Sequence, residues 1–180
     1  MARVEWLTVG GPAEPWRDIG LAVVDGTIPL FGTGIRIDPT HEPGLVGWAM
    51  SGLADAVSSI DGVLTEAVAP LRPVFIEHPV GAIGLDHVVV ATDSLERTCR
   101  AIEDATGAPL KRVREVGAIR QGFHRIGGGG LIVEVVERSG LPEGPASIGP
   151  AKPAVQPGRS IATVRESAGL GLPVALMTPG

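Results

Sequence analysis

Two stretches decide the fold of this chain, Leu85-Asp86-His87-Val88-Val89-Val90 and Leu131-Ile132-Val133-Glu134-Val135-Val136. Each is a short apolar run of the kind that forms a buried β-strand, and each contains a titratable side chain among valines. A buried strand holds such a group only when the group is paired, binds a metal or lines a cavity. His87 and Glu134 therefore indicate a site.

The segment between these strands predicts a helix from Asp93 to Thr106. Asp93 and Glu96 have the spacing of a capping box, in which each side chain bonds to the other's free backbone N–H. Four apolar residues then recur at helical spacing on one face: Leu95, Cys99, Ile102 and Ala105. Gly107 can adopt the left-handed conformation that ends a helix. Cys99 lies on the apolar face, which favours a role in the core over that of a nucleophile.

Three more strands are expected after this helix, so that the order over 85–137 is strand, helix, strand, strand, strand. They are predicted at 109–116, 118–126 and 131–136, with a glycine-rich hairpin at 127–130. The N-terminal portion repeats this order faintly. Its predicted strands lie at 4–9, 21–24, 28–37 and 44–50, with a helical turn within 12–18. A proline-containing connector follows, and a hairpin at 160–164 and 173–177 ends the chain.

Composition excludes several classes of function. The chain has 180 residues, of which 44% are hydrophobic and 19% charged, as expected of a folded protein. A net charge of −5, few aromatic residues and no tyrosine argue against a nucleic-acid partner. The basic cluster of Lys111, Arg112 and Arg114 is short and is expected to be a solvated strand edge. Glycine and proline together form about a quarter of the chain, which favours short strands and many turns.

Location and redox state are also constrained by the sequence. No apolar run approaches the length of about 18 residues that suits a membrane span. The first residues lack the anatomy of a signal peptide, so we expect a cytoplasmic protein without a membrane partner. A single cysteine excludes an intrachain disulfide framework.

Residues 84–137 resemble one βαβββ module of the vicinal-oxygen-chelate superfamily. This superfamily includes glyoxalase, extradiol dioxygenases, fosfomycin-resistance enzymes and bleomycin-binding proteins. The resemblance is carried by the run 84–90 with 93–96 for the first strand and helix, and by 132–135 for the fourth strand. The whole chain is similar to glyoxalase-like proteins of bacteria that have this composition. The resemblance implies an α+β fold in which paired βαβββ modules form a curved mixed sheet around a cleft.

The resemblance also implies a division of the chain. Residues 1–66 would be a degenerate N-terminal module, 67–83 a connector and 84–137 the well-formed module. Residues 138–180 would be a loop and a hairpin that completes the sheet. Another first strand and helix are expected between Ser147 and Ile148, where the sequence has no room for them. An incomplete hairpin of this kind would have to complete its sheet with the N-terminal portion or with a second subunit, so a homodimer is a further expectation.

In metal-dependent members of the superfamily, a first-strand His or Gln and a fourth-strand Glu of each module bind a divalent metal. Here His87 and Glu134 match these positions, which implies a site for Zn²⁺, Ni²⁺, Mn²⁺ or Fe²⁺ and no organic cofactor. The matching N-terminal positions fall at Trp6 and near Gly47, neither of which coordinates metal. The chain therefore shows half of a four-ligand set, which His124, another chain or the substrate would have to complete.

Other roles for these residues remain open. His87 could be a hydrogen-bonded core histidine, and Glu134 could act as a general base or face solvent beside an arginine. His124 is a candidate third ligand or proton shuttle, but an exposed position on its strand is the alternative. Gln121 lies on the opposite alternation of that strand, so only one of the two can face the cleft. Trp6 and Trp48 are candidates for the wall of an apolar pocket.

Two functions are expected from the resemblance. The first is a glyoxalase-like enzyme of the lyase or isomerase type that activates a small molecule with vicinal oxygens through a divalent metal. The alternative is a metal-free protein that binds and sequesters a small or drug-like molecule in the same cleft, and the missing half of the ligand set favours it.

Overall fold

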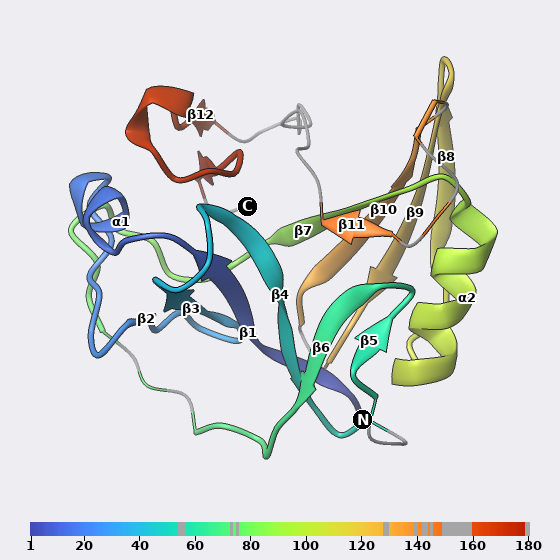
Figure 1. The fold of residues 1–180 in the computed structure, drawn as a ribbon, viewed down its shortest axis with the longest axis horizontal. Coiled ribbons are helices and arrows are strands. Elements are labelled where there is room, and N and C mark those ends of the chain that lie inside the picture. The colour runs from blue at the N-terminus through green and yellow to red at the C-terminus, as the bar shows by residue number, and fades with distance from the viewer. Residues whose placement is uncertain are drawn as a thin grey trace.

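The computed structural model describes residues 1–53, 57–72, 74, 76–127, 130–138, 140–141, 144, 146–148 and 160–178. Two mixed sheets pack against each other, and the longer of the two helices covers one of them (Figure 1). The predicted α+β class is confirmed. Within these residues, no helix is long and apolar enough to cross a membrane.

The first sheet contains six strands in the order β2-β3-β1-β4-β6-β5. Its strands are β1 (Arg3–Gly10), β2 (Thr27–Ile28), β3 (Gly34–Asp38), β4 (Gly44–Ser51), β5 (Ser59–Ile60) and β6 (Val63–Ala67). The short helix α1 (Glu14–Asp18) lies between β1 and β2. β1 is parallel to β3 and antiparallel to β4, and β4 is parallel to β6. The sheet therefore consists of two small units that meet at the β1–β4 pair.

The second sheet is built from the predicted βαβββ module. Its strands are β7 (His87–Thr92), β8 (Arg112–Val116), β9 (Ile119–Arg125), β10 (Ile132–Glu137) and β11 (Ser147–Ile148), in the order β11-β7-β10-β9-β8. β10 is parallel to β7, and β9 is antiparallel to β10 and β8. The strand order predicted for 85–137 is confirmed. β8 is one of the two edge strands, and all five of its residues are exposed, as expected for the basic cluster.

Helix α2 (Leu95–Thr106) begins two residues later than predicted and has a different cap. Ser94 is the N-cap, and its side chain accepts from the backbone N–H of Arg97. The Glu137 carboxylate on β10 accepts from the backbone N–H of Leu95 at 2.7 Å. The expected capping box does not form because Glu96 instead pairs with Arg120. The C-terminal end is as predicted, with Gly107 at φ +69°.

The N-terminal portion differs from the predicted module in one respect that matters for the site. A fourth module strand runs parallel to the first, as β10 does to β7, whereas β4 runs antiparallel to β1. β3 is the parallel partner of β1, and so it takes the fourth-strand place. The expected strand at 21–24 is reduced to a single bridge between Val24 and Thr27. Short apolar runs do not specify the direction in which a strand pairs, which only the packed sheet settles.

The C-terminal part repeats this arrangement in a reduced form. β11 pairs antiparallel with β7, as β4 does with β1, so it stands where the first strand of a further unit belongs. The residues that follow, 149–159, lie outside the described part of the chain. β12 (Ile161–Thr163) and β13 (Ala175–Met177) form the expected terminal hairpin, with the 3-10 turn η1 (Glu166–Ala168) between them.

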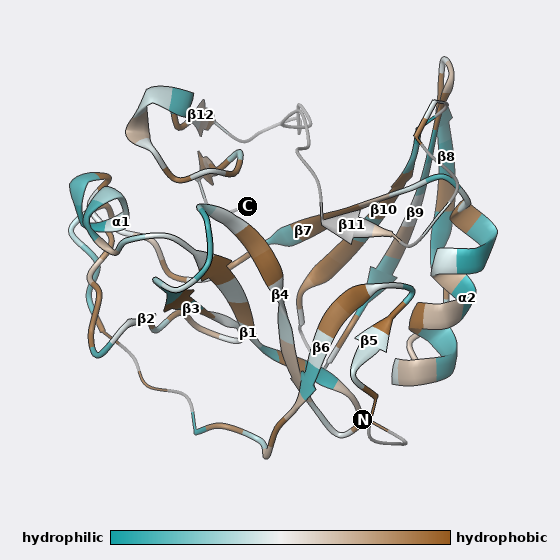
Figure 2. Cartoon of the chain, viewed as in Figure 1, coloured by the Kyte–Doolittle hydropathy of each residue, from teal (hydrophilic) through white to brown (hydrophobic). Residues whose placement is uncertain are grey.

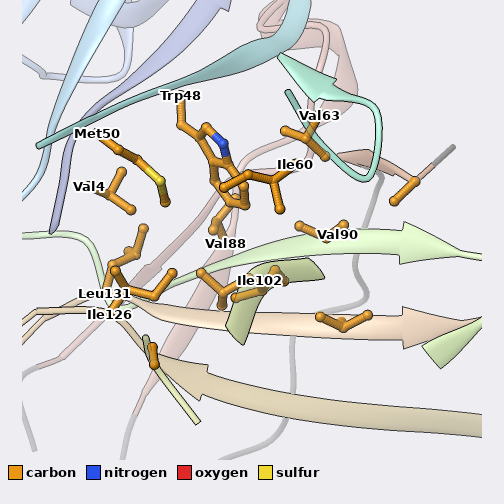
Figure 3. Packing of buried hydrophobic residues seen from close by; sticks show 14 of the residues in the cluster. Val4, Trp48, Met50, Ile60, Val63, Val88, Val90, Ile102, Ile126 and Leu131 are labelled. Atoms are coloured by element: carbon orange, nitrogen blue, oxygen red, sulfur yellow. The ribbon is translucent and has the colours of Figure 1, made fainter. Parts of the chain in front are cut away.

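The core consists of two apolar clusters, and the larger of them holds the two sheets together. The larger joins the inner face of the six-stranded sheet to β7, β10 and α2, and Trp48 of β4 lies over Val88 of β7 within it (Figure 3). The smaller gathers around Trp16 and includes Leu170 from the C-terminal hairpin. The hydropathy colouring shows β4 and β10 as largely apolar and α2 as a helix with one polar side (Figure 2). Cys99 is buried in the larger cluster, as predicted, and burial raises the pKa of its thiol to about 11.

Candidate functional site

His87 and Glu134 lie on the same face of the five-stranded sheet, which we call the site face. In the parallel β7–β10 pair, His87 is opposite Ile132 and Glu134 is opposite Val89. Residues two apart on a strand project from the same side, and partners across a ladder share that side. The two side chains are therefore neighbours on adjacent strands.

The other face of this sheet packs against α2, and it carries His124. The position of Gly122 shows which face this is, because a Cβ added there would meet the Cys99 Sγ at 2.8 Å. His124 projects from the same side as Gly122, is 1% exposed, and its Nδ1 donates to the Ala108 carbonyl at 2.9 Å. Burial lowers the pKa of His124, which keeps its ring neutral. The structure therefore does not bring His124 to His87 and Glu134.

The two site-face side chains have different surroundings. Glu134 is 8% exposed, and its carboxylate accepts from the Gln121 amide at 2.5 Å. The His87 side chain is 24% exposed, and its Nδ1 lies 3.0 Å from the Asp86 carboxylate. Gln121, rather than His124, is thus the β9 side chain that faces the site.

An open cavity of about 1410 Å³ adjoins this face. His87 and Val89 of β7 form one wall, and residues of the C-terminal hairpin lie in another. Most of the remaining lining is apolar: Leu7, Val9, Trp16, Leu21, Leu30, Ile35, Leu170, Leu172 and Val174. Glu134 is not part of the lining, but its ladder partner Val89 is. The cavity therefore presents a broad apolar wall, and its polar lining includes His87 with Asp86, Arg165 and Glu166.

The tryptophan that lines the cavity is not one of the two predicted for its wall, Trp6 and Trp48. Trp16, on α1, lines the cavity, whereas Trp48 is in the core and Trp6 is outside the lining. The Trp6 ring instead lies on Gly34, where an added Cβ would come within 2.3 Å of it. No spacing in the sequence distinguishes Trp16, because its exposure to the cavity depends on how α1 and the C-terminal hairpin fold over the six-stranded sheet.

A divalent metal needs more donors than this face brings together. Among the described residues, no group of three or more His, Cys, Asp or Glu side chains is placed to hold a metal ion. His87 and Glu134 provide two donors, and structural and catalytic metal sites in proteins generally use three or four. The residues described thus do not complete a resident metal site.

The six-stranded sheet shows what stands at the matching positions. When Trp6 is aligned with His87, the register of β1 and β3 places Arg36 where Glu134 lies in the other sheet. Arg36 donates to the Thr8 hydroxyl at 3.0 Å and to the Glu66 carboxylate at 2.5 Å. The counterpart of the predicted ligand is therefore a cation in an ion pair, and it is located on β3 rather than near Gly47.

Comparison with known proteins supports the fold. No family model matches the sequence, and no curated protein matches it. Among solved structures, a triple mutant of 4-hydroxymandelate synthase from Streptomyces coelicolor aligns with a TM-score of 0.51 at 16% identity, over 75% of this chain and 62% of that one. BphC, a halotolerant catechol dioxygenase, aligns with a TM-score of 0.45 at 12% identity, over 74% of this chain and 64% of that one.

The chain has the vicinal-oxygen-chelate fold. The resemblance seen in residues 84–137 is thus confirmed at the level of architecture. The chain spans about three-fifths of the length of the synthase. Within this fold, residues 84–137 contain β7, α2, β8, β9 and β10.

Proposed function

We propose that this protein binds a small, largely apolar molecule in the cavity beside β7, with His87 at the polar edge of the site. The cavity carries this proposal. Small-molecule sites in proteins are concave, mostly apolar and equipped with a few polar groups that orient the ligand. A cavity of about 1410 Å³ lined mainly by aliphatic residues and Trp16, with Asp86, His87, Arg165 and Glu166 among its polar residues, has this character.

The position of the C-terminal hairpin supports the same function. Leu170 packs into the apolar cluster around Trp16, while Leu172 and Val174 remain partly exposed along the cavity wall. Removing apolar surface from water is favourable by about 25 cal/mol per Å². A ligand that covers the exposed apolar side chains of this wall is therefore bound more tightly. The hairpin thus provides a wall that an apolar molecule can complete.

The test is binding of the neutral fluorescent probe N-phenyl-1-naphthylamine. We expect saturable binding to the wild type, and a dissociation constant at least tenfold higher in Val174→Glu, because a charge in the wall must be desolvated when the probe enters. Val113→Glu is the matched control, since Val113 is exposed on β8, projects from the opposite side of the sheet with Gly122, and is not part of the lining. Failure of the wild type to bind, or equal loss in both variants, would contradict the proposal.

A second candidate is a metal-dependent enzyme of the lyase or isomerase type that acts on a molecule with vicinal oxygens. It is favoured by one observation, the presence of His87 and Glu134 as neighbours on the site face. If a further donor completes the site, wild-type protein incubated with Zn²⁺, Ni²⁺, Mn²⁺ or Fe²⁺ and then desalted should retain metal near stoichiometry.

Mass-spectrometric metal analysis distinguishes the two candidates. The metal-dependent candidate requires that His87→Ala and Glu134→Gln lose the metal with an unchanged circular dichroism spectrum. Gln121→Ala is the comparison, because Gln121 touches Glu134 and is not a candidate ligand. If the wild type retains none of the four metals, the metal-dependent candidate is ruled out and only the metal-free binding function remains.

A further inference from the structure

Three arginines project from the outer half of the site face. Across the ladders, Arg112 of β8 is opposite Phe123, which is opposite Glu134. Arg114 is opposite Gln121, and Arg125 of β9 is opposite Ile132, the ladder partner of His87. Alternation places all three on the side of the sheet that carries His87 and Glu134.

These arginines have no carboxylate partner among the described residues, in contrast to those on the other side of the sheet. There Arg120 pairs with Glu96, Glu115 and Glu137, and Arg97 pairs with Asp61 and Asp93. Arg100 of α2 pairs with Asp104. Charged side chains on an edge strand discourage pairing with another chain. This does not explain why the arginines on the helix side have carboxylate partners while those on the site face have none among the described residues.

Arg112 is additionally held in place by an aromatic ring. Its guanidinium carbon lies 4.9 Å from the centroid of the Phe123 ring, a cation–π contact that leaves the N–H groups of the fork free to donate. A guanidinium of this kind suits bidentate recognition of a carboxylate or phosphate. The protein as a whole has a net charge of −5, so this local excess of positive charge is not a general property of its surface.

We propose that Arg112 and Arg114, with Arg125, bind the negatively charged group of the small molecule whose apolar part occupies the cavity. The ligand is then an apolar carboxylate or phosphate. This inference rests on the proposed binding function and adds the charge of the ligand to it. Adjacent strands are about 4.8 Å apart, so roughly 14 Å separates the backbone of β8 from that of β7 at the cavity wall. A ligand that reaches both the arginines and the cavity wall therefore has to lie across β9 and β10.

The test compares benzoate, inorganic phosphate and the neutral isostere benzamide, titrated by NMR into ¹⁵N-labelled protein. We expect benzoate and phosphate, but not benzamide, to shift the amide signals of β8 and β9. In the double variant Arg112→Gln/Arg114→Gln, the dissociation constant for benzoate should rise at least fivefold. The control Arg17→Gln/Arg100→Gln removes the same net charge at two exposed arginines away from the site face. It should change the dissociation constant for benzoate less than twofold.

The outcomes separate this inference from the proposed function. Equal shifts with benzoate and benzamide, or equal losses in the two double variants, would overturn the anion site. Binding of N-phenyl-1-naphthylamine tests the cavity independently, because the probe carries no charge. If the probe binds and the anions do not, the inference fails and the binding function stands; the reverse result leaves the anion site and overturns the cavity.

Discussion

Trp48→Ala is expected to lower the free energy of unfolding by about 3–5 kcal/mol, the usual cost of deleting a large buried aromatic side chain. Trp48 is 2% exposed and lies in the apolar cluster between the two sheets, over Val88 (Figure 3). Its indole N–H also donates to the Thr65 hydroxyl at 2.8 Å. Truncation therefore removes packing between the sheets and leaves a buried hydroxyl without its donor.

Guanidinium denaturation followed by circular dichroism measures this effect, and Trp48→Phe is the control. Phenylalanine keeps one aromatic ring in the core but loses the second ring of the indole and its N–H, so its cost should be about 1–2 kcal/mol. Because Val88 follows His87 on β7, the alanine variant should also weaken probe binding in the cavity. A Trp48→Ala protein within 1 kcal/mol of the wild type would show that the two sheets do not depend on this contact.

Asp61→Ala is the second substitution expected to have a large effect, a loss of about 3 kcal/mol. Asp61 lies in the turn between β5 and β6, and its side chain is 10% exposed. Its carboxylate accepts from Arg97 Nε at 2.9 Å and from the Thr98 hydroxyl, both on α2. Its backbone carbonyl accepts from the N–H of Ala146 at 2.7 Å. One residue of the first sheet thus holds the helix and a segment near β11.

A series at this position separates the contributions. Asp61 has φ +46°, a conformation that glycine and asparagine accept more readily than alanine. Asp61→Asn should cost about 1 kcal/mol because it loses the charge, and Asp61→Gly about 2 kcal/mol because it loses the contacts without backbone strain. Thermal and chemical denaturation should give the order Asn, Gly, Ala. An alanine variant as stable as the asparagine variant would contradict the role of both strain and carboxylate.

The βαβββ module was predictable because its signals are local. The buried strands 87–92 and 132–137, the amphipathic helix and Gly107 each follow from residues within one element. The site face was predictable for His87 and Glu134 from the fold resemblance. It was not predictable for Gln121 and His124, because alternation shows that they differ in orientation and does not show which of them faces the helix. Only the packing of Gly122 against Cys99 identifies that face.

His78 illustrates the same limit in a loop. A histidine beside a proline in an extended connector is usually solvated, yet His78 is 3% exposed. Its Nδ1 accepts from the N–H of Ala22 at 3.0 Å, and its Nε2 lies 2.8 Å from the Pro29 carbonyl. These backbone partners are 56 and 49 residues away in the chain, so no local pattern indicates them.

Local pattern alone was sufficient for the element types of residues 84–137 and for the placement of a titratable group in each of two buried strands, because hydrophobic periodicity and capping act within a few residues. Tertiary packing decided the direction in which β4 pairs with β1, the burial of His124 and the formation of the cavity under the C-terminal hairpin. Each of these depends on contacts between segments that are distant in sequence. Such contacts stabilise the protein only once the sheets have packed, so no local pattern encodes them.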